Sequence, residues 1–198
     1  MKPESAWHYD GDLKAALVSA ARAIVEADGP AALTLRAVAR ATGVSAMAPY
    51  HHFRDRSALV AAVAAQGFDQ LYSEKIAALA AAPGDPAQRI VAGSIAYVRF
   101  VAEHPALYRL MKSPALADRS AHPDLAAAAA RPGQSLAAML AELAASGRLR
   151  AISADQAGAI IWAMVHGIAT LANDGFLADP EPLAADGAAA LLAGWGAL

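Results

Sequence analysis

The sequence contains no cysteine among its 198 residues, which excludes disulfide bonds and thiolate metal sites. Without cysteine, nothing in the composition indicates that the protein works in an oxidising compartment. Its first ten residues hold no apolar stretch, so we expect no signal peptide and a cytoplasmic location. Aromatic residues make up only 6% of the chain and charged residues only 17%. The net charge of -2 does not by itself suggest a nucleic-acid-binding protein.

Motifs of common enzyme and metal sites are also missing. The chain has no glycine-rich phosphate loop, no His-Glu zinc motif and no Glu-x-x-His pair. The adjacent His51 and His52 would point in different directions from a helix, which argues against a metal site there. We therefore expect neither catalytic activity nor a bound metal or cofactor.

Alanine dominates the apolar content of 57%, and alanine favours closely packed helices. No segment shows the alternation of β-branched residues that predicts a strand. The sequence therefore predicts an all-α protein of about nine helices, with an N-terminal three-helix unit and a C-terminal helical bundle. We expect three regions: residues 1–56, a connecting helix at 57–82, and a domain at 83–198 that begins at the breaker Pro83-Gly84-Asp85-Pro86.

Residues 34–56 predict two short helices joined by a tight turn. Thr34 can cap the first helix, and Gly43 can take the positive φ that ends it. Ser45 can cap the second helix, which runs to about residue 50 or 51. Four arginines against one aspartate give the segment a charge of about +3 on an otherwise acidic chain. Two helices crossing steeply at such a turn form a helix-turn-helix, whose second helix enters a DNA major groove.

This segment resembles the DNA-binding domain of the TetR family of transcriptional regulators. The residues that carry the resemblance are Thr34, Val44-Ser45, Tyr50-x-His52-Phe53 and Asp55-Arg56, followed by an apolar helix. The resemblance implies a regulator, which we expect to be a repressor released from its operator by a small hydrophobic effector. The alternative is a helical ligand-binding protein or enzyme that has lost DNA binding. Two positions depart from the family pattern, with Met47 in place of the usual glycine and Arg56 in place of the usual lysine.

The resemblance also implies how the protein contacts double-stranded DNA. Contacts that position the protein on phosphates are expected from Thr34, Tyr50, His52 and Arg56. Contacts with base edges are expected from Arg36, Ala46 and Met47. Ser45 and His51 complete the expected DNA-binding set. A symmetric dimer would present two such surfaces, so the expected operator is palindromic.

Residues 157–172 form a run without any formal charge. At about 1.5 Å per residue this run is too short for the ~30 Å hydrocarbon core of a bilayer, so we expect burial against protein and no membrane contact. The last helix, expected at 180–195, also lacks a wide polar face. The apolar surfaces of two such helices must be buried against another chain, and we expect a homodimer built by 154–173 and 180–195. Within the first of them, Ile161 and Ile168 are expected in the dimer contact.

The C-terminal domain is also expected to hold an unidentified effector. Helices at 86–103 and 153–173 both carry aromatic or imidazole side chains with polar tips, which suits a mostly apolar ligand. The expected pocket residues are Tyr97, Val101, Tyr108, Met111, Trp162 and His166. The competing interpretation is that these side chains only pack the core. The Trp-x-x-x-His-Gly stretch, together with residues 104–111, resembles one C-terminal subgroup of TetR-like proteins.

Overall fold

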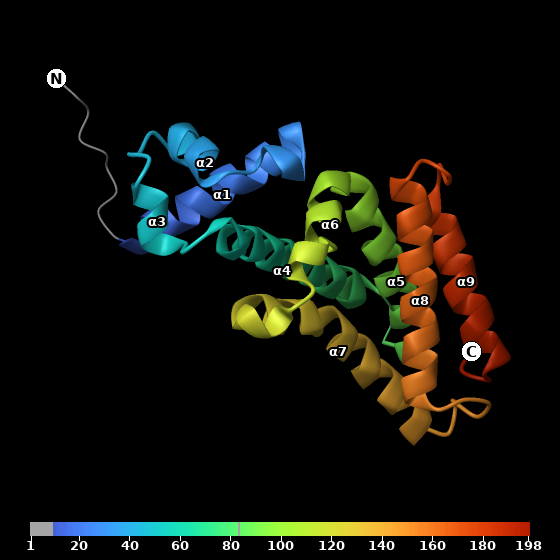
Figure 1. Ribbon diagram of the computed structural model, residues 1–198. Coiled ribbons are helices and arrows are strands. Elements are labelled where there is room, and N and C mark those ends of the chain that lie inside the picture. Colours follow the sequence, from blue (N-terminus) through green and yellow to red (C-terminus); the bar gives the residue numbers. More distant parts are fainter. Residues whose placement is uncertain (1–9, 83) are drawn as a thin grey trace. The chain divides into compact units, whose positions relative to one another are not determined.

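The computed structural model describes residues 10–82 and 84–198. Over these residues the chain forms nine α-helices and no strand, which confirms the predicted all-α class (Figure 1). Residues 1–9, where we expected no signal peptide, and Pro83 of the expected breaker lie outside the described residues. None of the described helices is long and apolar enough to cross a membrane.

The helices and short 3₁₀ turns follow one another along the chain with brief connections. In order they are α1 (Asp10–Asp28), η1 (Pro30–Ala32), α2 (Leu35–Thr42), α3 (Ala48–His52), α4 (Arg56–Ala81), α5 (Pro86–Glu103), α6 (Pro105–Met111), η2 (Pro114–Leu116), η3 (Arg119–Ala121), α7 (Pro123–Ala145), α8 (Ala154–Asn173) and α9 (Pro180–Gly194). Over the described residues they form two compact units, the first up to Gly67 together with Pro105–Ala128 and the second from Phe68 to His104 together with Ala129–Leu198. Helix α4 contributes its first part to one unit and its second part to the other.

The first unit is built around α1, which contacts α2, α3 and α6. Leu17, Ala21 and Val25 recur at helical spacing on α1 and are fully buried, so one face of that helix forms the core. Helix α6 joins this unit rather than the C-terminal region. A Cβ at Gly67 of α4 would lie 2.8 Å from Sδ of Met111, so only glycine lets α4 and α6 approach this closely.

The position of α6 differs from the expected division of the chain. We expected residues 83–198 to form one domain, but 105–128 cluster with the N-terminal helices. The reason is long-range packing: Leu107 and Leu110 of α6 are buried, and the helix contacts α1 and η1. Such contacts leave no trace in the local sequence pattern.

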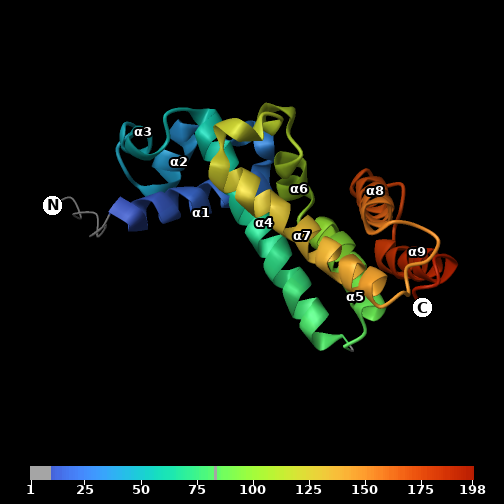
Figure 2. The ribbon, with the colours of Figure 1, turned by 90° about the horizontal axis from the view of Figure 1, so that it is seen from below.

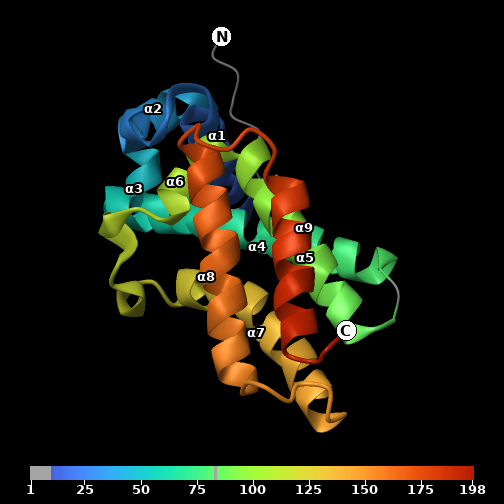
Figure 3. The ribbon, with the colours of Figure 1, turned by 90° about the vertical axis from the view of Figure 1, so that its right-hand side faces the viewer.

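The second unit is centred on α5, which packs against both α8 and α9 (Figure 3). A salt bridge from Arg99 to Glu181 fastens α5 to α9. At the other end, Arg148 donates two hydrogen bonds to the carboxylate of Asp85, at 3.0 and 3.1 Å, and lowers the pKa of that carboxyl. Asp85 also caps α5 by accepting from the amide of Ala87.

The sequence Pro132-Gly133 predicts a kink or a split in this part of the chain, but helix α7 is not split there. It remains one helix from Pro123 to Ala145 with Pro132 inside it, and it lies beside α5 in Figure 2. Ser153-x-x-Gln156 in the sequence predicts a capping box at the start of α8, and the structure confirms it, with the Ser153 hydroxyl accepting from the amide of Gln156. Ser57 is the residue that the sequence predicts as the cap of α4, and this prediction is wrong: Asp55 accepts the amide hydrogen bond of Ala58 at 2.8 Å.

Candidate functional site

The structure contains the predicted helix-turn-helix as α2 and α3. Oγ1 of Thr34 accepts the amide of Ala37 at 3.0 Å, which confirms the expected N-cap. Gly43 ends α2 with a φ of 72°, in the left-handed region that favours glycine. Ser45 is not the side-chain cap we predicted, because α3 starts only at Ala48 and its N-cap residue makes no side-chain hydrogen bond. The turn between the helices is therefore longer than the sequence indicated.

The exposed side of this motif carries most of the residues expected at DNA. Met47 is 64% exposed and Tyr50 is 45% exposed, and both project from the start of α3. Arg36, Ser45, Ala46 and His51 are also exposed, whereas His52 is half-buried beside Phe53. The flexible, unbranched side chain of methionine can adapt to an irregular partner surface. The second helix of the motif thus presents an adaptable apolar tip.

A surface concavity joins the two helices of the motif. It is lined by Thr34, Leu35, Arg36, Tyr50, Arg54, Asp55 and Arg56. Four of the expected DNA-binding residues therefore lie together: Thr34, Arg36, Tyr50 and Arg56. With Arg54, the two arginines among them bring three guanidinium groups to this surface, and such groups suit phosphate oxygens. Arg54 was counted in the local charge but not among the expected contacts. Its side chain is 70% exposed and lies beside Asp55, so it belongs with this surface.

Arg56 has a second role that the sequence did not indicate. Its Nε donates to the carbonyl of Leu33 at 2.6 Å, and its Nη2 donates to the carbonyl of Pro30 at 2.8 Å. These bonds tie the start of α4 to the segment before α2. Arginine can do this with its forked donors, whereas lysine has a single nitrogen. The departure from the usual lysine thus has a structural consequence within this unit.

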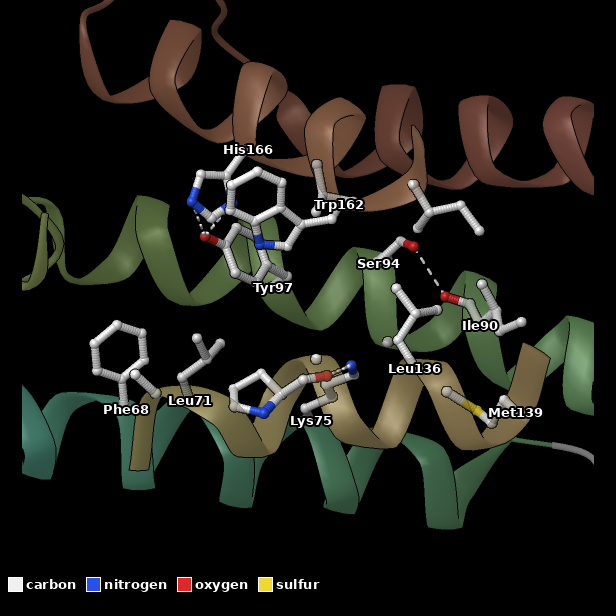
Figure 4. Close-up of a pocket in the computed structure, with 16 residues that line it drawn as sticks. Phe68, Leu71, Lys75, Ile90, Ser94, Tyr97, Leu136, Met139, Trp162 and His166 are labelled. Carbon is white, nitrogen blue, oxygen red and sulfur yellow. Dashed lines mark hydrogen bonds between the residues drawn. The ribbon is translucent and has the colours of Figure 1, made fainter. Parts of the chain in front are cut away.

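The second unit contains a partly open cavity of about 120 Å³, with the half-exposed Trp162 in its wall (Figure 4). It is lined by four helices: α4, α5, α7 and α8. Most of its wall is apolar, from side chains such as Leu71, Ile90, Leu136 and Val165. The volume is close to the ~150 Å³ of engineered cavities that bind benzene, so it suits a ligand of about one aromatic ring.

Three of the six expected pocket residues line this cavity. The hydroxyl of Tyr97 lies 2.8 Å from Nδ1 of His166, and a hydrogen bond joins α5 to α8 there. The ring of Trp162 lies against His166, with centroids 4.3 Å apart. Figure 4 shows the three rings gathered at one side of the cavity. This cluster could orient a polar group on a bound molecule.

The other three expected pocket residues lie elsewhere. Val101 is fully buried on α5 but is not among the residues that line the cavity. Tyr108 and Met111 belong to α6 and to the first unit, so the pocket prediction was wrong for them. The sequence analysis also missed Lys75, whose ammonium nitrogen donates to the carbonyl of Pro132 at 2.7 Å in the cavity wall.

Comparison with known families agrees with the helix-turn-helix and the bundle. A family model described as bacterial regulatory proteins of the tetR family matches residues 17–63. A second model, described as the tetracyclin repressor-like C-terminal domain, matches residues 90–193, more than half of the chain. The chain belongs to the TetR family. It is therefore a DNA-binding transcriptional regulator. The narrower resemblance to a Trp-x-x-x-His-Gly subgroup stays a prediction.

Solved structures of similar proteins share this TetR-family fold. A protein of unknown function from Rhodococcus sp. RHA1 is 31% identical, with a TM-score of 0.84 over 98% of this chain and 100% of that one. The TetR family regulator PfmR from Thermus thermophilus is 20% identical, with a TM-score of 0.68 over 89% of this chain and 97% of that one. RolR, solved with resorcinol, is 21% identical, with a TM-score of 0.65 over 94% of this chain and 88% of that one. No curated protein matches the sequence significantly.

Proposed function

We propose that this TetR-family regulator is a homodimeric repressor that leaves a palindromic operator when a small, mostly apolar molecule enters the cavity of the second unit. The observation that carries the proposal is the cavity itself, an apolar space with a polar cluster at one side. RolR, a structural neighbour, was solved with resorcinol, a one-ring ligand of the size that this cavity suits.

Helix α4 supplies a physical route between ligand and DNA. Phe68, Leu71 and Lys75 of α4 line the cavity, and the first part of the same helix belongs to the helix-turn-helix unit. A ligand weakens DNA binding only if it binds the released form more tightly than the DNA-bound form. We propose that contacts with α4 provide that difference in affinity.

Exposed apolar side chains on α8 and α9 support the proposed dimer. Ile160, Ala163, Gly167 and Leu171 recur at helical spacing along one exposed stripe of α8. Leu183 on the neighbouring α9 is also exposed. A contiguous apolar surface of this kind marks a protein contact site. Pairing of α8 and α9 with their symmetry mates would give a four-helix bundle.

The proposed effector response can be tested by removing one hydroxyl from the cavity. Tyr97→Phe deletes the hydroxyl that bonds to His166 while preserving the ring, so it should keep DNA affinity within about twofold and shift the ligand concentration for half-maximal release by roughly fivefold or more. The measurement is fluorescence anisotropy of an operator fragment, taken from the protein's own upstream DNA, during titration with one-ring aromatic compounds.

The matched control for this experiment is Tyr72→Phe, which removes a hydroxyl from α4 outside the cavity wall. It should change neither DNA affinity nor release. If no one-ring or larger apolar compound releases the wild-type protein from DNA, the effector part of the proposal is wrong. If both tyrosine variants shift release equally, the cavity is not the site.

A second prediction separates positioning contacts from base contacts. Tyr50→Phe should weaken binding to every DNA sequence by a similar factor, roughly three- to tenfold, because it removes a donor to phosphate. Met47→Gly should instead change the order of preference among operator variants, since it alters the surface presented to base edges. Binding of both proteins to a panel of singly substituted operators at fixed salt measures the two effects. A uniform loss for Met47→Gly across the panel would remove its proposed role in reading sequence.

A further inference from the structure

The cavity wall contains one lysine, Lys75, and no carboxylate side chain. Sixteen residues line the cavity, and they include no aspartate and no glutamate. Of the polar groups present, the Ser94 hydroxyl donates to the carbonyl of Ile90 in its own helix, and Tyr97 is bonded to His166. Lys75 thus brings a positive charge into a wall that has no negative charge to balance it.

Lys75 is deeply buried for a lysine. Its exposed fraction is 7%, and burial lowers its pKa to about 8, so the amine still carries its proton at neutral pH. Its one hydrogen bond in the described part of the chain goes to the carbonyl of Pro132. An ammonium group has three donors. A buried cation with a single neutral acceptor is poorly compensated.

The hydrogen bond from Lys75 to α7 does not explain why residue 75 is a lysine. The Pro132 carbonyl also accepts a hydrogen bond from Oγ of Ser135, one turn further along α7, at 3.1 Å. The acceptor would therefore be satisfied without a cation. A leucine or methionine at residue 75 would continue the apolar stripe of Phe68 and Leu71 at no electrostatic cost.

The second unit is shaped to hold this lysine where it is. A Cβ at Gly93 of α5 would lie 3.0 Å from Cε of Lys75 and 3.1 Å from Cδ1 of Leu79. Only glycine leaves the lysine stem this much room between α4 and α5. Gly93 and Tyr97 are four residues apart on α5, which is about 6 Å along the helix axis. The ammonium group and the Tyr97–His166 pair thus mark two sides of one small space (Figure 4).

We infer that the ligand of this cavity is a compact apolar carboxylate, with its anionic group paired to Lys75 and its hydrocarbon part against the apolar wall. The inference rests on the proposed effector cavity and specifies its ligand class. A carboxylate supplies the counter-charge and the acceptors that the buried ammonium lacks. The cavity volume suits an apolar part of about one aromatic ring or a branched chain of similar size. Benzoate is the simplest probe of this class.

The test compares benzoate with its neutral isostere benzamide. Isothermal titration calorimetry at pH 7 should show that the full-length wild-type protein binds benzoate roughly tenfold or more tightly than benzamide, as expected for a hydrogen-bonded buried ion pair. Lys75→Met should remove this preference by weakening benzoate, while benzamide changes by no more than about twofold. Thermal melting of both proteins establishes that the variant is folded.

Several results would overturn the inference. Equal binding of benzoate and benzamide to the wild-type protein would show that charge is not recognised, and the effector cavity itself would stand. Unchanged benzoate affinity in Lys75→Met would leave the lysine without the proposed role. Binding of neither probe, nor of any neutral one-ring aromatic compound, would overturn both the ligand class and the cavity as an effector site. If Lys75→Met does not fold, the wild-type preference for benzoate decides, and Lys75→Gln repeats the comparison.

Discussion

Lys75→Met is expected to raise the free energy of unfolding of the ligand-free protein by about 2 kcal/mol at pH 7. The pKa of Lys75 falls from 10.5 to about 8 on burial, and desolvation is the cause. That shift means that the folded state disfavours the charged amine by ~3 kcal/mol. The substitution removes this penalty but also loses the hydrogen bond to Pro132, which costs about 1 kcal/mol and leaves the net gain of about 2 kcal/mol. Urea denaturation followed by circular dichroism measures the difference.

The same shift predicts how the difference changes with pH. Above pH 8 the folded protein releases the Lys75 proton, while the unfolded chain keeps it up to pH 10.5. The unfolded state then binds more protons, so wild-type stability rises with pH in this window. The advantage of Lys75→Met should therefore shrink by about 2 kcal/mol between pH 7 and pH 9.5. The other titratable groups on the cavity wall, Tyr97 on α5 and His166 on α8, are present in both proteins.

The matched control is Lys14→Met, because Lys14 is exposed on α1. It should change stability by no more than about 0.5 kcal/mol. A wild-type protein more stable than Lys75→Met at pH 7 would show that the bond to Pro132 outweighs desolvation. The expected gain would mean instead that the lysine is kept at a cost in stability, as is common for residues that serve binding.

The helix-turn-helix could be predicted from sequence because its signals are local. Thr34 caps the helix that it precedes, and Gly43 takes the positive φ that its position requires. The second helix was placed less well, since Pro49 directs α3 to start at Ala48 whether or not Ser45 can cap it. Local chemistry thus defined the motif but not the length of its turn.

The cavity could be predicted only in part because its walls come from distant segments. The cluster of Tyr97, Trp162 and His166 was found from helical spacing on two apolar helices. Tyr108 and Met111 were misplaced because nothing in their local sequence shows that α6 packs on α1. Lys75 could have been found, because it follows Phe68 at i+7 and Leu71 at i+4 and so shares their apolar face of the helix.

The last two helices illustrate the limit of periodicity. A helix that is apolar on every side does not show which face it buries. We expected Ile161 and Ile168 in the dimer contact, but they are 2% and 7% exposed within one protomer, so that assignment was wrong. The exposed stripe lies one residue away and includes Ile160, which is 41% exposed. One position along a helix rotates a side chain by about 100°, which is enough to exchange the two faces.

Ala163→Glu is expected to convert the proposed dimer into a monomer and to reduce operator affinity by roughly 100-fold or more. Ala163 is exposed at the middle of the α8 stripe, next to Gly167, where a Cβ would meet nothing within 4 Å. Small residues at these positions allow close approach of a second helix, and a buried unpaired carboxylate on each partner would prevent it. A monomer binds one half-site at a time and loses the gain from linked binding. Light scattering gives the mass, and anisotropy gives the affinity.

Ala80→Glu, the same change at an exposed position of α4, should leave both the dimer mass and the operator affinity unchanged. If Ala163→Glu and Gly167→Glu both keep the dimer mass and the operator affinity, another surface must form the dimer.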